Sequence, residues 1–93
     1  MREEDLLKAA AFIKRGKNKR AVFLALGEPI LPNELVLKVF GKKSENAYSI
    51  VSRALKELKK EDLVNILNPE ERTGRVWLLT DKGKAVYKKL GKR

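Results

Sequence analysis

The sequence predicts an α+β fold that is mainly α-helical, formed as a single domain over residues 1–93. Apolar residues recur at helical spacing through most of the chain, which is typical of amphipathic helices that share a core. Two short apolar runs, 63–67 and 75–79, flank a turn-rich loop and predict one β-hairpin. A chain of 93 residues fits one domain, because two halves would each be too small to bury a core.

The N-terminal part of the chain predicts two helical segments. Residues 3–15 form an amphipathic helix, and the apolar run 21–26 belongs to a second segment that Gly27 and Pro29 end. Gly16 lies between the two segments. The sequence leaves open whether this glycine breaks the helix or only bends it.

A second pair of helices follows in the middle of the chain. Residues 30–31 form either a short strand or an extended link. Pro32 suits the first turn of a helix, which stops at Gly41. Ser44 is a good N-cap for the next helix, residues 45–61.

Helix 45–61 has the clearest amphipathic pattern. At 100° per residue its apolar face consists of Ala47, Val51, Ala54, Leu55 and Leu58. Its polar face consists of Asn46, Ser49, Arg53, Lys56 and Lys60. We expect the first face in the core and the second in solvent or on a partner.

The C-terminal part predicts a hairpin and a final helix. Strands 63–67 and 75–79 are joined by the loop 68–74, and residues 80–81 cap a helix that ends at Gly91. Two helices joined by a short turn and followed by a hairpin are the elements of a winged helix-turn-helix. The sequence therefore predicts this fold, with the hairpin as the wing.

Charge and composition restrict the function. The chain has 22 Lys and Arg against 12 Asp and Glu, a formal net charge of +10, and neither His nor Cys. Zinc and copper sites, disulfides, catalytic triads and cysteine nucleophiles are therefore close to excluded. No glycine-rich phosphate loop is present. We expect a protein that is not an enzyme and uses no cofactor and no metal.

No apolar run approaches the roughly 18 residues that span a bilayer, and residues 1–5 lack the apolar stretch of a secretion signal. The expectation is a cytoplasmic protein with no membrane partner. The absence of Gln, the single Met and the abundant Lys and Glu match the composition reported for hyperthermophiles. Chance together with a basic function explains that composition as well.

Four segments resemble a known family. Residues 51–58, VSRALKEL, followed by Leu63-Val64, are similar to the recognition helix of winged-helix regulators of the MarR/ArsR type. Residues 68–77, NPEERTGRVW, resemble the wing of archaeal members, and 79–83, LTDKG, resemble the Leu-Thr-x-x-Gly signature after the wing. The basic run within 12–20 is similar to the start of the archaeal chains. The resemblance implies an archaeal, sequence-specific transcriptional regulator that binds double-stranded DNA.

One segment departs from that family. The stretch 41–46 between the two helices looks longer than the usual turn of about three or four residues. This departure affects which residue first enters a DNA groove, but not the fold.

The predicted interface has helix 45–61 in the major groove and the loop 68–75 on the flanking backbone or minor groove. Arg53, at the centre of the polar face, suits a bidentate contact with guanine. The residues predicted to bind DNA are Lys42, Lys43, Ser44, Asn46, Tyr48, Ser49, Ser52, Arg53, Lys56, Arg72, Thr73 and Arg75.

 Asn46 and Ser49 are short hydrogen-bonding side chains near the start of this helix, where base contacts concentrate, and Lys42 and Lys43 precede the helix and suit phosphates.

The sequence leaves open other roles for several of these residues. An exposed polar stripe is also what any solvated helix face looks like, and capping or solvation explains Ser49 and Asn46 as well as base contacts do. Tyr48 contacts either the DNA backbone or the core. The basic run 14–20 is equally a solvated face or a phosphate site. A basic C-terminal helix and tail favour solubility and non-specific attraction to nucleic acid, through Lys82, Lys84, Lys88, Lys89, Lys92 and Arg93.

The same fold and charge suit other functions. An RNA-binding or ribosome-associated protein, a non-specific architectural chromatin protein and a protein–protein adaptor are the alternatives to a regulator. Trp77 and Leu79 share one strand face and are expected in the core. The first and last helices are candidates for a homodimer interface, because one helix and one wing read only a short half-site.

Overall fold

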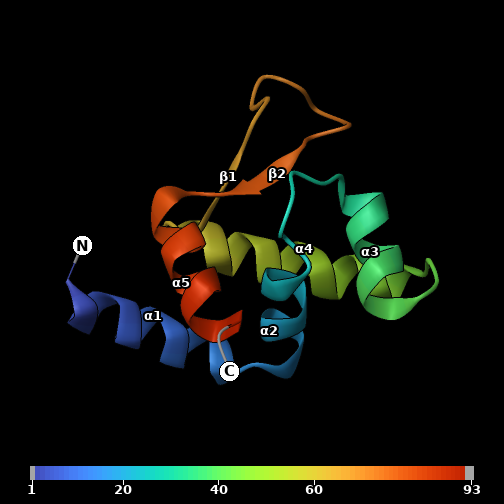
Figure 1. Ribbon diagram of the computed structural model, residues 1–93. Coiled ribbons are helices and arrows are strands. Elements are labelled where there is room, and N and C mark those ends of the chain that lie inside the picture. The colour runs from blue at the N-terminus through green and yellow to red at the C-terminus, as the bar shows by residue number, and fades with distance from the viewer. Residues whose placement is uncertain (1, 92–93) are drawn as a thin grey trace.

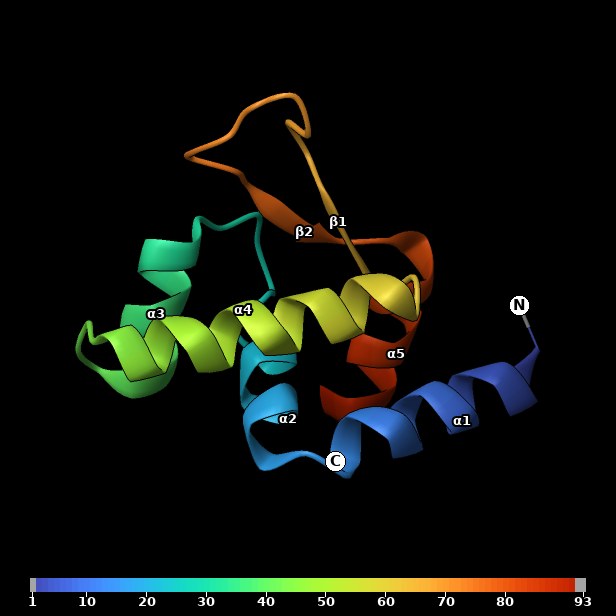
Figure 2. The same ribbon diagram turned by 180° about the vertical axis from the view of Figure 1, so that it is seen from behind.

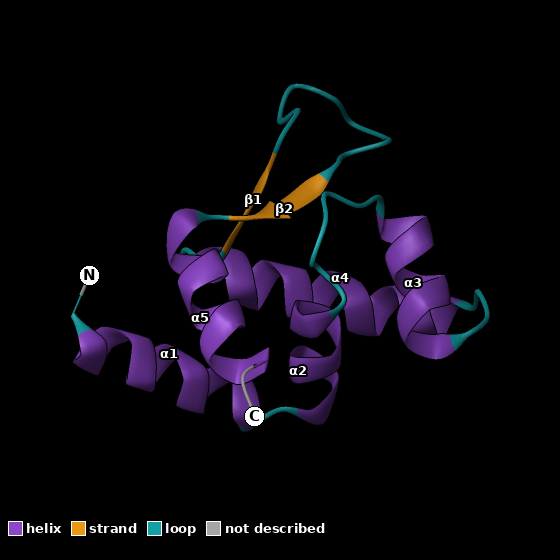
Figure 3. Ribbon diagram, viewed as in Figure 1, coloured by secondary structure: helices purple, strands orange, loops and turns teal. Residues whose placement is uncertain are grey.

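The computed structural model describes residues 2–91, so Met1, Lys92 and Arg93 lie outside the described residues. It has an α+β fold that is mainly helical, with one antiparallel hairpin (Figures 1 and 3). The elements in chain order are α1 Glu3–Lys14, α2 Lys17–Leu24, α3 Pro32–Phe40, α4 Glu45–Lys60, β1 Val64–Ile66, β2 Trp77–Leu79 and α5 Asp81–Gly91. The order and type of the elements agree with the sequence prediction.

Gly16 breaks the chain between α1 and α2. It has extended backbone angles, φ −111° and ψ 119°, and serves as the N-cap position of α2. The second helix begins at Lys17, four residues before the apolar run that predicted it, and ends at Leu24. The basic residues Lys17, Lys19 and Arg20 therefore lie in the first turn of a helix.

A short turn joins α3 to α4. Gly41 ends α3 in the left-handed region, with φ 77°, where glycine has no steric penalty. The Ser44 hydroxyl accepts a hydrogen bond from the Ala47 amide at 3.1 Å and starts α4 at Glu45. The connection is thus residues 41–44. The expectation of a turn longer than four residues was wrong, because this cap already draws Glu45 and the next residue into the helix.

The hairpin pairs β1 with β2 in the register Val64↔Leu79, Asn65↔Leu78 and Ile66↔Trp77. Both strands are shorter than predicted, although the Leu67 amide still donates to the Val76 carbonyl at 2.8 Å. Ile30 forms an antiparallel bridge with Trp77 on its other side, with two backbone hydrogen bonds of 2.9 Å. Of the two readings left open for residues 30–31, the structure therefore has strand-like pairing at Ile30.

The core is made by one side of every helix. All five residues of the predicted apolar face of α4 are buried. Helix α4 packs against α2, α3 and β1. It crosses the rear of the molecule in Figure 1 and the front in Figure 2, while α5 lies on the opposite side. The outer face of α4 therefore stays uncovered within the described chain.

Helix α5 closes the core from the other side. The Thr80 hydroxyl accepts a hydrogen bond from the Gly83 amide at 3.0 Å, which caps the helix as the sequence predicted. Val86 is fully buried, and Leu79 of β2 is buried as well. Trp77, expected in the core, is half-buried and packs against it. Helices α1 and α5 pack on each other, and Lys89 pairs with Glu3 between them.

Candidate nucleic-acid interface

The outer face of α4 carries the largest group of predicted contact residues. Asn46, Ser49, Ser52, Arg53 and Lys56 are all exposed, and the structure brings four of them together. A shallow depression on this face, the central hollow, is lined by Tyr48, Ser49, Ser52, Arg53 and Lys56. This hollow offers hydroxyl, guanidinium and ammonium groups to one ligand.

Arg53 lies on one flank of this face. It lines both the central hollow and a second depression on the side of α2, whereas Lys56 lines the central hollow and the space next to the hairpin. Arg53 therefore lies to one side of the exposed face, and not at its centre as the sequence had predicted. At 100° per residue, Ser49 and Lys56 point straight out from the buried face.

Two predicted contact residues have structural roles. The Ser44 hydroxyl is engaged in the cap of α4. Tyr48 is half-buried, and its hydroxyl donates a hydrogen bond of 2.8 Å to Asn33 Oδ1 on α3. This bond links α3 to α4. The sequence missed Asn33, which lies 15 residues earlier with no pattern that links it to Tyr48.

A groove separates α4 from the loop of the hairpin. This hairpin groove has a volume of about 620 Å³. Its cations are Lys56, Lys59, Arg72 and Arg75, with Thr73 and Gly74 beside them. No acidic side chain lines it, and Leu55, Ile66 and Trp77 contribute apolar surface. The three predicted loop residues thus face the same space as α4, and Lys59, absent from the prediction, joins them.

The hairpin loop, residues 67–76, is held by Asn68. Its Nδ2 donates to the Gly74 carbonyl at 3.1 Å, and its Oδ1 accepts from the Val76 amide at 2.8 Å. The Asn68 carbonyl accepts from the Glu71 amide at 3.1 Å. Arg75 Nε donates to the Glu71 carbonyl at 2.5 Å, so one guanidinium edge is engaged within the loop. Arg72 is exposed.

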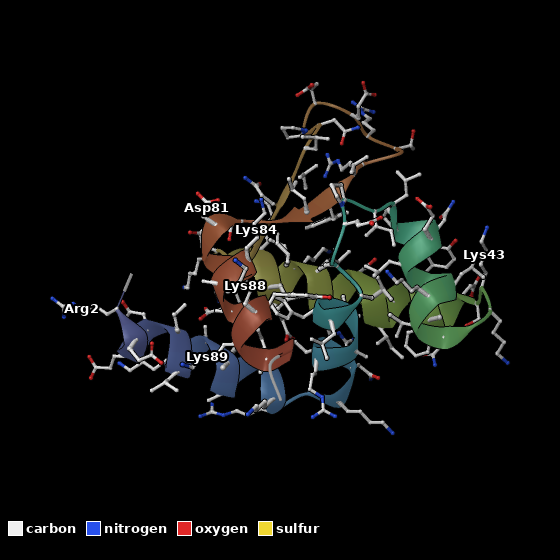
Figure 4. The ribbon with its side chains drawn as sticks, viewed as in Figure 1. Arg2, Lys43, Asp81, Lys84, Lys88 and Lys89 are labelled. Atoms are coloured by element: carbon white, nitrogen blue, oxygen red, sulfur yellow. The ribbon has the colours of Figure 1, made fainter. Side chains whose placement is uncertain are left out.

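Lys42 and Lys43 stand apart from this site. Both are exposed on the turn 41–44. Figure 4 shows Lys43 at the end of the molecule beyond α3, remote from the hairpin loop. The structure does not bring these two lysines into the central hollow or the hairpin groove. Their predicted phosphate contacts need a ligand that extends past the N-terminus of α4.

An acidic residue on the flank of this face is paired within the fold. Glu57 of α4 forms an ion pair with Lys19 of α2, with Nζ and Oε2 3.1 Å apart. The same ammonium group lies 3.7 Å from the centre of the Phe12 ring, a cation–π contact. The exposed charges on α4 that remain at this face are the cations Arg53 and Lys56 and, in its first turn, the carboxylate of Glu45.

No group of three or more acidic side chains within residues 2–91 is placed to hold a metal ion. None of the helices in that range has the length and apolar character needed to cross a bilayer. No protein-family model, curated protein or solved structure matches the chain.

Proposed function

We propose that the chain is a winged helix-turn-helix protein that binds double-stranded DNA, with α4 as its recognition helix. The observation that carries the proposal is that the central hollow on the exposed face of α4, lined by hydroxyl and cationic groups, adjoins a basic groove that no acidic side chain lines. A helix is about 10–12 Å across and the major groove of B-DNA about 12 Å wide, so an uncovered helix face fits there.

The arrangement of the elements supports the fold assignment. Helices α3 and α4 are joined by the four residues 41–44, the length typical of a helix-turn-helix. The hairpin follows α4 directly, and Trp77 pairs with Ile66 on one side and Ile30 on the other. In this arrangement the hairpin loop is the wing.

The proposed division of labour follows from side-chain chemistry. Ser49 and Arg53 suit base edges, because a hydroxyl accepts or donates and a guanidinium forms a bidentate pair with guanine. Lys56, Lys59 and Arg72 suit phosphates beside the groove. Sequence-specific regulation of transcription is the function that this combination of base-reading and phosphate-binding groups fits best.

The proposed active form is a homodimer, since one helix and one wing cover only a half-site. Leu7 of α1 is a large apolar side chain that is 53% exposed, next to the packed pair α1 and α5. A second copy packed against this surface would place a second α4 on the same duplex.

Non-specific binding is a second candidate, favoured by the cations on the opposite side. Figure 4 shows Lys84 and Lys88 on α5, which lies in front of α4 in that view. Charge spread over both sides attracts any nucleic acid. RNA readers usually present exposed aromatic platforms. All six aromatic residues of the chain are buried or half-buried: Phe12, Phe23, Phe40, Tyr48, Trp77 and Tyr87.

Fluorescence anisotropy tests the proposal with three ligands: the duplex upstream of the protein's own gene, a random duplex and a structured RNA. Each is titrated at several salt concentrations. We expect a preference for the upstream duplex that Arg53→Ala abolishes, whereas the matched control Lys88→Ala retains it. Equal binding to all three ligands, with equal salt dependence, would refute sequence-specific regulation and leave non-specific attraction.

A further inference from the structure

A second basic surface borders α4 on the side away from the hairpin. It lies at the corner where α1 meets α2, beneath α4 in Figure 2. Its exposed polar residues are Lys14, Arg15, Lys17, Asn18 and Arg20. None of them was among the residues predicted from the sequence to bind DNA. The sequence left open whether the run 14–20 is a solvated face or a phosphate site.

This corner is joined to the face of α4. A depression of about 300 Å³, the corner hollow, lies between them. Its lining residues are Gly16, Lys17, Asn18 and Lys19 from the corner, and Ile50, Arg53, Ala54 and Glu57 from α4. Arg53 also lines the central hollow, which in turn shares Ser52 and Lys56 with the hairpin groove. The three depressions therefore form one band across α4.

The two lysines of the corner hollow differ in their contacts. Lys19 is held by Glu57 and by the Phe12 ring, and only 16% of its side chain is exposed. It cancels the one acidic group in the hollow. Lys17 is exposed, as is Asn18 beside it. The charge that this hollow offers to a ligand therefore comes from Lys17 and Arg53.

We propose that the corner between α1 and α2 binds the sugar–phosphate backbone of the DNA strand that borders α4 on the side opposite the hairpin, with Lys17 as the principal contact. This inference rests on the proposed DNA binding by α4. A helix that fills the major groove has a backbone strand on each flank, because the groove is about as wide as the helix. The hairpin groove serves one strand, and the corner hollow serves the other.

The proposal assigns no base contact to the corner. A lysine that binds a phosphate adds affinity equally for all sequences and increases the dependence of binding on salt. Lys17→Glu therefore isolates this contribution. A glutamate in the first turn of α2 agrees with the helix dipole, so the substitution is not expected to unfold the chain.

The test compares Lys17→Glu with Lys88→Glu, which makes the same change of net charge on α5, on the far side of the molecule. Affinity for a random duplex is measured by anisotropy across salt, with thermal melts as the check on folding. For Lys17→Glu we expect affinity to fall on the order of tenfold and the slope of log K against log salt to lose about 0.9, one phosphate contact. Lys88→Glu should change the affinity less than about threefold and leave most of the slope.

Equal losses of affinity and slope in the two variants would overturn the proposal, because only net charge would then matter. Arg53→Ala distinguishes a failure of the corner site from a failure of DNA binding by α4. If Arg53→Ala impairs binding while Lys17→Glu behaves like Lys88→Glu, the corner is no phosphate site but α4 still binds DNA. If the unaltered chain binds no duplex at low salt, the proposed function and the corner site both fail.

Discussion

The substitution Gly83→Ala tests the packing that holds α5 in place. A Cβ atom added to Gly83 would lie 2.0 Å from the Leu63 carbonyl oxygen and 3.3 Å from Leu79 Cβ. Real Cβ atoms essentially never approach within 3.0 Å, so the backbones must separate by about 1 Å. Leu63 cannot move freely, because its carbonyl accepts from the Thr80 amide at 3.1 Å and its amide donates to the Leu58 carbonyl at 3.0 Å.

The expected loss of stability follows from two opposing effects. Overpacking a well-filled core costs typically about 1–3 kcal/mol, and a backbone clash of this size belongs at or above the top of that range. Alanine is favoured over glycine inside a helix by about 1 kcal/mol. The net effect of Gly83→Ala is a decrease in the free energy of unfolding of about 2 kcal/mol or more, which lowers the melting temperature by about 8–16 °C.

Urea denaturation followed by fluorescence measures this effect. The chain has a single tryptophan, Trp77, which is half-buried in β2 and reports on the core. Lys84→Ala, at the next position of the same helix and exposed, is the matched control and should change stability by less than about 0.5 kcal/mol. A Gly83→Ala protein as stable as the control would refute the close approach of α5 to Leu63.

Three further substitutions test other contacts. Ser44→Ala removes the cap of α4 and should cost about 1 kcal/mol in urea denaturation, whereas Ser44→Asp, which keeps an acceptor, should retain most of the stability. Lys19→Ala loses its cation–π contact and its ion pair and should cost about 1 kcal/mol, while the exposed neighbour Lys17→Ala should lie within about 0.5 kcal/mol of the original. Asn68→Ala removes two hydrogen bonds of the hairpin loop, so duplex affinity measured by anisotropy should fall several-fold, with a loss of stability of about 1–2 kcal/mol. Unchanged affinity for Asn68→Ala would mean that the loop's shape does not matter for binding.

The sequence predicted best the features that depend on local periodicity. Helix α4 was placed within one residue at its end, and its five apolar residues are all buried. The reason is that a 16-residue helix packed on one side repeats its pattern over more than four turns. The cap at Ser44 and the stop at Gly41 are equally local, since each depends on one side chain or one backbone angle.

Features that depend on distant contacts were missed or left open. The first turn of α2 is a run of polar residues from Lys17 that no apolar pattern marks as helical, and Lys19 finds its partners in α1 and α4. Ile30 pairs with Trp77 across 47 positions, so nothing near it in the sequence decides between strand and link. Most of the predicted contact residues of α4 and the hairpin loop meet in space, but Lys59 and Asn68 became visible only through the groove and the loop that they help to form.

Neighbouring cations in this chain differ in what they can do, and burial explains the difference. Lys19 lies between the Phe12 ring and the Glu57 carboxylate, so its charge is already paired within the fold. Lys17, two residues earlier, stays exposed beside Arg53. Substitution of Lys19 should therefore lower stability, and substitution of Lys17 should lower duplex affinity and its salt dependence. If instead both lysines changed the same property, net charge and not position would govern the behaviour of this surface.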